Sequence, residues 1–346
     1  MADGINNYSF DFETEAEALR QSLPWWKRKK ILLAEVNVSE DKSGTVDVDL
    51  LHLAGDDRPK KKLLPDIRRE IDKQFKAEPY FGSYEKSVAY AQMYNFVFFR
   101  TNSPFNACLG EDNTSLMQLF TLYHETGHAL ITGGPRIDKT HPYGECAADA
   151  YAALRFLRRF GDDAKPIISM ISWKRTYNAV NFLDTTHLTT TVLDKIIADS
   201  ATRDFSKLSE AQTIKLAAEY AKKWMPEDAA FEASRMIFTQ GDQINFPLLA
   251  STCLGSSDNF AFYIGAKFFQ PFLQPEGIVR DDETIQIPDD ERQKYAAMIE
   301  QRASGISLRD IVNPAAKKPE AGPQQPLIET LKVSRPRGQK QFIYKP

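Results

Sequence analysis

The chain contains little cysteine and little histidine, and it has no long apolar run. Its three cysteines, Cys108, Cys146 and Cys253, are widely spaced and odd in number, which excludes a disulfide framework and a CxxC metal knuckle. We expect small buried hydrophobic side chains in a reducing compartment, the alternative being an oxidisable thiol at Cys146. No stretch approaches the roughly 18 consecutive apolar residues that a membrane-spanning helix needs.

Neither sign of charge dominates the composition. The 346 residues include 44 Lys or Arg and 47 Asp or Glu, for a formal net charge of −3. This balance gives no general attraction to nucleic acid or to anionic lipid, so any such contact has to be local. The polar stretch Met1–Phe12 also lacks the pattern of a signal peptide. We expect a cytoplasmic protein with no nucleic-acid partner and no membrane span, although an exported effector with no signal peptide would share these features.

Aromatic and basic residues are concentrated at one place near the N-terminus. Two tryptophans and four basic residues follow one another from Trp25 to Lys30. A solvated helix face closed off by two packing aromatic side chains is the favoured interpretation. The alternative is a local patch for a membrane or for nucleic acid.

Residues 1–110 are predicted to contain a small sheet. Ile31–Val38 and Gly44–Leu53 are rich in β-branched and aliphatic residues, and a hairpin through Glu40–Gly44 would join them. Another strand is predicted at Tyr94–Arg100. An edge strand over Tyr94–Thr101 would suit the binding of an extended peptide.

From Thr114 to residue 304 the apolar period changes to about 3.6, which predicts helices. We divide this part into metal-binding helices at 111–165 and a helical subdomain at 166–312. Residues 313–346 contain six prolines and are predicted to be a flexible tail or extended arm, with Phe342–Tyr344 as a segment that could dock.

The motif that suggests chemistry lies on a predicted helix of about five turns. Asp112, Asn113 and Thr114 offer N-cap oxygens, and Gly133-Gly134-Pro135 would end the helix. The apolar face is made by Leu116, Leu119, Phe120, Tyr123 and Leu130.

His124 and His128 are four residues apart on this helix, so their imidazoles project from one side and can bind one ion. Glu125 lies about 100° away round the helix, where it can reach a water molecule at that ion. Gly127 costs about 1 kcal/mol relative to Ala in a helix. We expect close approach of a neighbouring backbone to offset this cost.

A catalytic zinc ion generally has three protein ligands, so a third ligand is needed. The segment His141–Leu154 is predicted to open a second helix, which would end at Arg158–Gly161. Glu145 and Asp149 share one face of this helix. Glu145 would complete the ligand set, and Asp149 would accept a hydrogen bond from a ligand imidazole. His141 is the alternative ligand.

These residues resemble the HExxH metallopeptidases called zincins, and specifically the gluzincin branch, whose third ligand is a Glu on the following helix. His124–His128 matches the HExxH signature, and Glu145–Asp149 is similar to the ExxAD pattern of compact gluzincins. The resemblance covers roughly Asp112–Phe160. It implies zinc bound by the two histidines and Glu145, with Glu125 as general base and Asp149 orienting an imidazole.

Hydrolysis also needs a donor for the oxyanion that forms when water adds to a carbonyl. His187, on a Thr-rich stretch predicted to be helical, is the first candidate, followed by Tyr143 and Tyr177. A His bonded to a nearby hydroxyl is the alternative interpretation. His52, on a predicted strand, is expected to be structural.

The sequence therefore predicts an α+β, zincin-like fold, with a small N-terminal sheet packed on the HExxH helix and a mainly helical C-terminal part. The expected function is a Zn²⁺-dependent metallopeptidase acting on a protein or peptide substrate. The main alternative is a non-catalytic zinc-containing regulatory or protein-binding module. A weaker one is an enzyme that acts on a non-peptide amide or on its own chain.

Overall fold

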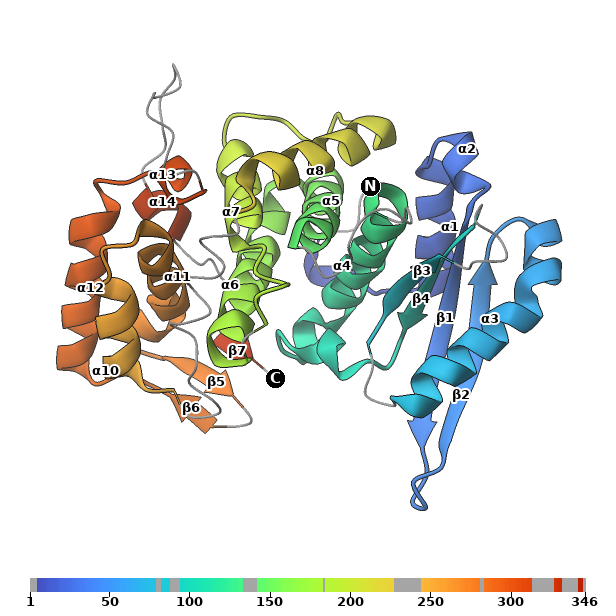
Figure 1. Cartoon of the computed structure of the whole chain (residues 1–346), viewed down its shortest axis with the longest axis horizontal. Helices are drawn as coiled ribbons and strands as arrows, with labels where there is room; N and C mark the ends of the chain where they lie inside the picture. Colours follow the sequence, from blue (N-terminus) through green and yellow to red (C-terminus); the bar gives the residue numbers. More distant parts are fainter. Residues whose placement is uncertain are drawn as a thin grey trace.

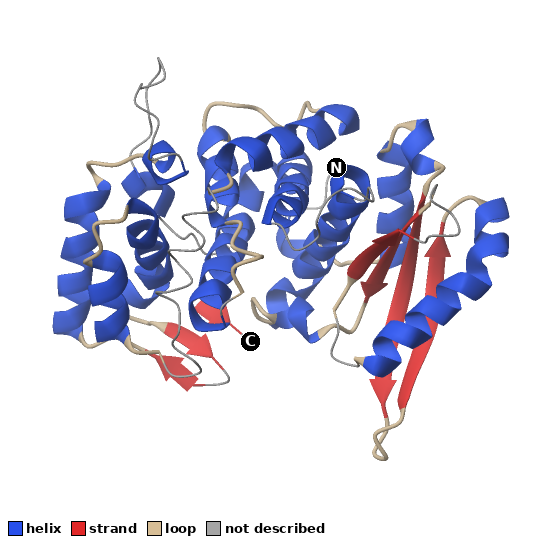
Figure 2. Ribbon diagram, in the orientation of Figure 1, coloured by secondary structure: helices blue, strands red, loops and turns tan. Residues whose placement is uncertain are grey.

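The structure is a computed structural model that describes residues 5–78, 82–87, 94–132, 142–182, 184–226, 244–280, 283–312, 327–331 and 342–344. A small N-terminal sheet lies at one end, and most of the remaining chain is helical (Figures 1 and 2). The predicted α+β class is therefore confirmed. Within the described ranges, no helix combines the length and the apolar character needed to cross a bilayer.

The N-terminal sheet has the strand order β2-β1-β4-β3. Its strands are β1 Ile31–Glu40, β2 Val46–Ala54, β3 Tyr84–Ser87 and β4 Asn95–Arg100. β1 runs antiparallel to β2, as the hairpin predicted, and parallel to β4. β3 pairs antiparallel with β4, so the prediction of an edge strand over Tyr94–Thr101 is wrong. The edge next to β4 is β3, whose short sequence carries too little apolar alternation to be recognised.

Both faces of the sheet are covered, which explains why β1 is almost entirely buried. Alternate residues of β1 and β4 face α3 Asp57–Ala77, whose apolar side chains recur every four residues. This layer is formed by Leu32, Ala34, Val36, Val38, Leu63, Ile67, Ile71, Phe75, Phe96 and Phe98. The intervening residues, such as Leu33 and Val97, pack into the larger core with α1 Phe12–Ser22 and with α4 Thr114–Gly127.

The HExxH helix has a different beginning and end from those predicted. A 3-10 turn, Glu111–Asn113, precedes α4, and the Asn113 side chain donates to the Leu109 carbonyl instead of capping the helix. After Gly127 the chain continues as a π-helix, His128–Thr132, and the predicted stop at 133–135 lies outside the described residues. The second predicted helix is α5 Pro142–Phe160.

The remaining helices are mostly in the C-terminal half, and a short one stands near the N-terminus. They are α2 Trp25–Arg28, α6 Lys165–Phe182, α7 Thr190–Asp199, α8 Glu210–Trp224, α10 Phe246–Leu249, α11 Asn259–Phe269, α12 Asp289–Ala303, α13 Leu308–Val312 and α14 Leu327–Leu331.

Two segments of the predicted flexible tail are folded against the rest of the chain. Leu327 and Leu331 of α14 are fully buried in the main core. Farther on, β7 Phe342–Tyr344 pairs in parallel with β5 Ile278–Arg280, which in turn pairs with β6 Glu283–Ile285. These two segments therefore fit the extended arm and not the flexible tail, and Phe342–Tyr344 docks as the sequence suggested it could. The partners themselves are too distant in sequence for a local pattern to reveal.

Candidate metal centre

The two motif-bearing helices, α4 and α5, pack closely because small residues lie between them. A Cβ atom added to Gly127 would lie 2.9 Å from the Cα of Ala148, which is closer than real Cβ contacts come. Ala147, Ala150 and Ala153 are fully buried on α5. The expected close approach of a neighbouring backbone at Gly127 is therefore confirmed, and it brings the side chains of the two motifs together.

His124, His128 and Glu145 converge so that one ligand atom from each lies within 4.8 Å of the others. The two Nε2 atoms are 3.1 Å apart. Glu145 Oε2 lies 3.2 Å from His124 Nε2, and Oε1 lies 3.3 Å from His128 Nε2. A tetrahedral ion with bonds of about 2.0–2.1 Å would hold its donor atoms about 3.3 Å apart. The observed distances, which involve one carboxylate oxygen for each imidazole, are compatible with a single ion bound by the two imidazoles and the carboxylate.

Asp149 connects this cluster to a buried layer of polar side chains. Its fully buried carboxylate lies 2.7 Å from His124 Nδ1. Arg175 on α6 donates to both carboxylate oxygens at 2.9 Å, and the Thr189 hydroxyl donates at 2.6 Å. Burial raises the pKa of Asp149, but Arg175 and His124 outweigh this effect and hold it well below its usual range. Asp149 is therefore an ionised acceptor that fixes the orientation of His124.

The three donor atoms require a positive charge between them. The ionised Asp149 carboxylate accepts a hydrogen bond from His124 Nδ1–H, so in neutral His124 the Nε2 atom presents a lone pair to the Glu145 carboxylate. That contact is repulsive unless a proton or a metal ion lies between the two atoms. Burial lowers the pKa of His124, but Asp149 and then Glu145 outweigh it and raise the value to about 10. Without a metal ion, a proton takes this place.

The Glu145 carboxylate also has capacity left for a ligand. Burial raises its pKa, but the histidines, His128 first, lower it well below the ordinary value, so the group is ionised. Its Oε2 atom is buried and makes no hydrogen bond of standard geometry within the described residues, although the nearest imidazole nitrogens of His124 and His187 lie 3.2 and 3.4 Å from it. A buried carboxylate oxygen costs free energy unless a hydrogen-bond donor or a cation binds it. These residues therefore fit a divalent cation that prefers nitrogen and oxygen donors.

His187 is brought to the same cluster, with Nε2 3.4 Å from Glu145 Oε2. The prediction that His187 lies on a helix is wrong, because the residue lies in the turn before α7. Its Nδ1 lies 2.7 Å from Asp184 Oδ1, which orients the ring. Burial raises the pKa of Asp184, but hydrogen bonding to His187 and the nearby charges lower it overall. The interval of three residues between Asp184 and His187 was a sequence signal for this pair that the prediction did not use.

Glu125 is buried on α4, next to His124 in the sequence. Tyr177 is buried on α6, where its hydroxyl accepts a hydrogen bond from Arg280. His52 pairs across the strands with Glu35, as a structural residue would.

The sequence also suggested Tyr143, Cys146 and His141 as residues near the metal. Tyr143 lies near the start of α5, where burial raises the pKa of its hydroxyl. The buried Cys146 thiol is not exposed near the donors, contrary to the alternative considered from the sequence, and burial raises its pKa as well. His141, the alternative ligand, lies outside the described residues.

Arg175 and Thr189 were not anticipated. A basic residue and a hydroxyl on separate elements carry no local signal that they will meet one carboxylate.

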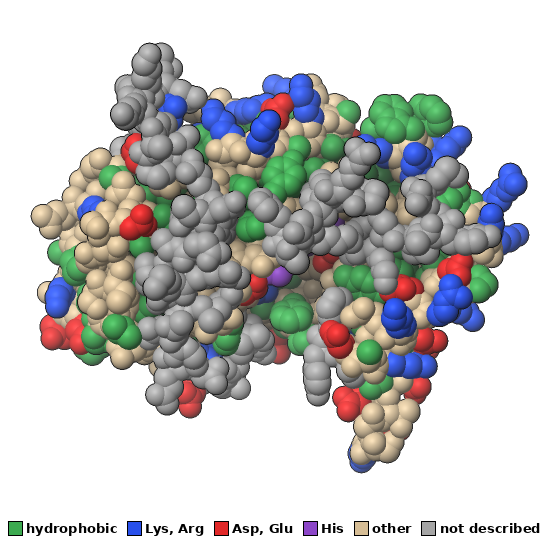
Figure 3. Space-filling model, viewed as in Figure 1, with side chains coloured by type: hydrophobic (Ala, Val, Ile, Leu, Met, Phe, Trp, Pro, Cys, Tyr) green, Lys and Arg blue, Asp and Glu red, His purple; other side chains and the backbone are tan. Residues whose placement is uncertain are grey.

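In the space-filling view, histidine surface is visible near the centre of the face, between the sheet part and the helical part (Figure 3).

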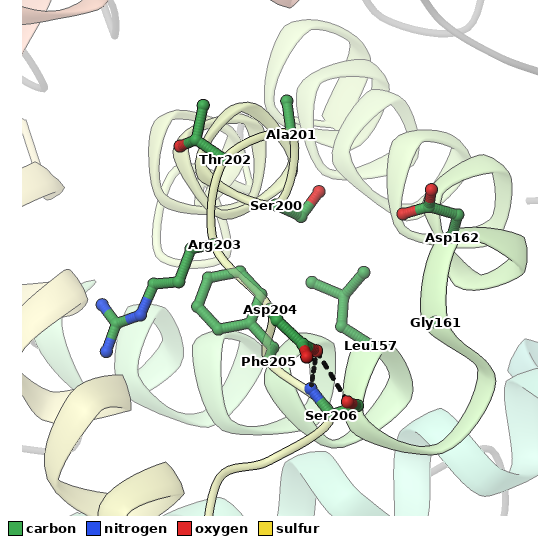
Figure 4. Close-up of a pocket in the computed structure, with 10 residues that line it drawn as sticks. All are labelled: Leu157, Gly161, Asp162, Ser200, Ala201, Thr202, Arg203, Asp204, Phe205 and Ser206. Atoms are coloured by element: carbon green, nitrogen blue, oxygen red, sulfur yellow. Dashed lines mark hydrogen bonds between the residues drawn. The ribbon is translucent and has the colours of Figure 1, made fainter.

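A separate hollow of about 350 Å³ lies between the end of α5 and the turn that connects α7 to α8 (Figure 4). Its lining includes Leu157, Arg203 and Asp204 but none of the three candidate metal ligands. The Asp204 carboxylate accepts hydrogen bonds from the backbone and hydroxyl of Ser206. This hollow is therefore distinct from the metal centre.

Comparisons of the chain with protein-family models, with curated proteins and with solved structures gave no match.

Proposed function

We propose that the chain is a zinc-dependent metallopeptidase of the HExxH type, with a zincin-like, gluzincin-like arrangement of His124, His128 and Glu145 as ligands. The observation that carries the proposal is the spacing of the donor atoms, 3.1–3.3 Å, together with the ionised, buried Glu145 carboxylate. Two imidazoles and a carboxylate are a common ligand set of catalytic zinc. A bound zinc ion would polarise a substrate carbonyl and lower the pKa of a water molecule to about 7.

The residues of the chain would then share the proton transfers. Glu125 would take a proton from the attacking water and deliver it to the leaving amine. The imidazolium form of His187, with Nδ1–H donating to Asp184, would donate through Nε2–H to the oxyanion that develops on the substrate carbonyl. Asp149 and Arg175 would keep His124 in the tautomer that leaves Nε2 free to bind the ion.

An extended peptide could align by adding a strand to β3 Tyr84–Ser87. Within the described residues β3 pairs with β4 on one side only, and it packs beside the π-helix that begins at His128. Strand addition supplies main-chain hydrogen bonds and fixes which carbonyl reaches the site. This role replaces the one that the sequence suggested for Tyr94–Thr101.

A second candidate function is a zinc-containing regulatory or protein-binding module without turnover. The observation that favours it is His187 Nε2, which lies as close to Glu145 as the two ligand imidazoles do. If this nitrogen bound the ion, it would fill the fourth position and leave no place for water.

The test combines metal analysis with proteome-wide cleavage profiling of the wild type and of Glu125→Gln. For the peptidase we expect Glu125→Gln to retain zinc and to lose turnover by about 10²–10⁴-fold, since the base is removed and the ligands are not. His187→Ala should also keep zinc while slowing cleavage. Retained cleavage in purified Glu125→Gln would exclude the mechanism. Loss of zinc in His187→Ala, with no cleavage by the wild type, would support the regulatory module.

A further inference from the structure

Trp25 and Trp26 are the most exposed large hydrophobic side chains of the described residues, at 61 % and 53 %. The expectation that these aromatic side chains pack against the protein is therefore wrong. Because exposed apolar area of this size costs free energy in water, clustered exposed aromatic side chains commonly mark an interaction surface. The two rings are adjacent, with centroids 6.1 Å apart.

Basic side chains surround the two rings. Lys27, Arg28, Lys29 and Lys30 follow them directly, and no acidic residue occurs between Leu23 and Lys30. Lys29 and Lys30 are exposed, and the Lys29 ammonium lies 5.0 Å from the ring centroid of Trp25. We call residues 25–30 the Trp–Lys patch. In the space-filling view, hydrophobic and basic side chains lie together over α2 (Figure 3).

The Trp–Lys patch is held firmly on the protein, although α2 is only one turn long. The Lys27 ammonium donates to the Leu130 carbonyl at 2.7 Å, and Arg28 donates to Gln21 at 2.6 Å. Backbone hydrogen bonds from Lys27 and Arg28 to the Pro24 carbonyl close the turn. The backbone that carries the rings is therefore anchored to the protein, which reduces the entropy that binding would cost.

We propose that the Trp–Lys patch docks the protein on the surface of an anionic lipid bilayer. Indole rings favour the boundary between headgroups and acyl chains, because one part of the ring is apolar and its N–H is polar. Lys and Arg beside them gain from the negative surface potential of anionic lipids. The chain as a whole is acidic, so this attraction is local to residues 25–30. Glu17, the acidic residue nearest to the end of α1, is paired with Arg20.

A single-stranded nucleic acid is a poorer fit to the same residues. Base stacking uses aromatic faces that can be presented to successive bases. Here the two rings are at 89° to each other, and the Lys29 ammonium lies over the ring of Trp25. The four residues of α2 and the two lysines that follow it form a compact patch, which suits a planar surface better than a strand. The proposal is independent of the metal centre and of any hydrolytic activity.

The test is sedimentation of the full chain with vesicles of phosphatidylcholine alone and of phosphatidylcholine containing about 30 % phosphatidylserine, at about 0.1 M salt. We expect the wild type to bind the anionic vesicles at least about tenfold more tightly than the neutral ones. Trp25→Ala/Trp26→Ala should lose most of this binding. Lys29→Glu should weaken it about tenfold, since reversing one charge removes an attraction and adds a repulsion.

Leu248→Ala and Lys294→Glu are the matched controls. They alter an exposed apolar side chain on α10 and an exposed lysine on α12, at the opposite end of the molecule from α2 (Figure 1). Both should bind like the wild type, and thermal unfolding verifies that every variant is folded. Equal binding to both vesicle types, no binding at all, or unchanged binding of Trp25→Ala/Trp26→Ala would overturn the proposal. So would tight binding of single-stranded DNA without binding of vesicles.

Discussion

Two buried clusters of charged side chains in this molecule differ in how completely they are satisfied. On the helical side, Asp194 and Lys267 are almost completely buried. Each carboxylate oxygen of Asp194 accepts a hydrogen bond from Lys267, and a second one from Ser172 or Tyr263. At the metal centre, by contrast, Glu145 Oε2 makes no hydrogen bond of standard geometry within the described residues, and imidazole nitrogens face one another.

The difference separates a structural cluster from a ligand site. In the Asp194–Lys267 cluster the opposite charges neutralise each other, so no further cation is needed. In the candidate metal centre the Glu145 carboxylate and the two imidazoles supply donor atoms that converge on one place and could hold a cation there. Burial of polar residues alone does not indicate function, but a convergent and incompletely satisfied set of donors does.

The largest effect on stability is expected from breaking the Asp194–Lys267 cluster. Lys267→Met leaves the Asp194 carboxylate buried without its cation, which should lower the free energy of unfolding by about 3–5 kcal/mol. Urea unfolding measures this loss. Lys215→Met, which alters the exposed pair of Lys215 with Glu219, should be neutral. Zinc binding by folded Lys267→Met should be unchanged, and a loss of zinc would show that the two clusters are not independent.

A smaller effect is expected from Asp149→Asn at the metal centre. Removing the charge that orients His124 should weaken zinc binding about 10–100-fold while the donors themselves remain. Competition with a chelator of known affinity measures the change. Asp162→Asn, at a largely exposed aspartate, is the control that should bind zinc like the wild type. Wild-type affinity in Asp149→Asn would show that Asp149 does not support the ion.

The packing that joins the two halves of the metal centre can be tested at Gly127. A methyl group there would meet the α5 backbone at Ala148, so Gly127→Ala should cost about 1–3 kcal/mol of stability and weaken zinc binding by separating the donors. Gly144→Ala is the matched control, because its nearest neighbour is His128 at 3.9 Å. Thermal unfolding with and without zinc compares them. Equal tolerance of the two substitutions would contradict the close packing.

The smallest effect for a single step is expected from pH, counted per pH unit of zinc affinity. A metal ion needs neutral His124, whereas the metal-free protein raises the pKa of His124 from 6.5 to about 10. Between these values, zinc binding has to displace a proton, so affinity should rise with pH by up to about tenfold per unit. Without zinc, the stability contributed by protonated His124 should be fully present below pH 6.5 and be lost toward pH 10. Zinc affinity that falls with rising pH would contradict this sign.

The parts of the site that sequence predicted are the local ones. The spacing of His124 and His128 on one helix, and of Glu145 and Asp149 on the next, follows from the helical period alone. Gly127 indicated close helix packing, because a glycine within a helix lowers its stability and close approach of a neighbouring backbone would offset that cost. The same reasoning found the β1–β2 hairpin, where apolar alternation and the turn lie within one stretch of chain.

The parts that could not be predicted depend on contacts between distant segments. Arg175 on α6 and Thr189, which directly precedes α7, meet Asp149 only after α7 has packed against both α5 and α6. The pairing of β7 with β5 joins segments more than 60 residues apart in sequence. The exposure of Trp25 and Trp26 also depends on which side of α2 the remainder of the protein covers.

The most direct test of the metal centre is zinc analysis with X-ray absorption spectroscopy on the purified chain, in parallel with His128→Ala. We predict about one zinc ion per chain, bound by two imidazole nitrogens and oxygen at about 2.0–2.2 Å, with zinc lost in His128→Ala. A wild-type chain that binds no zinc, or a His128→Ala variant that binds it equally well, would contradict the assignment of His124, His128 and Glu145 as the ligands.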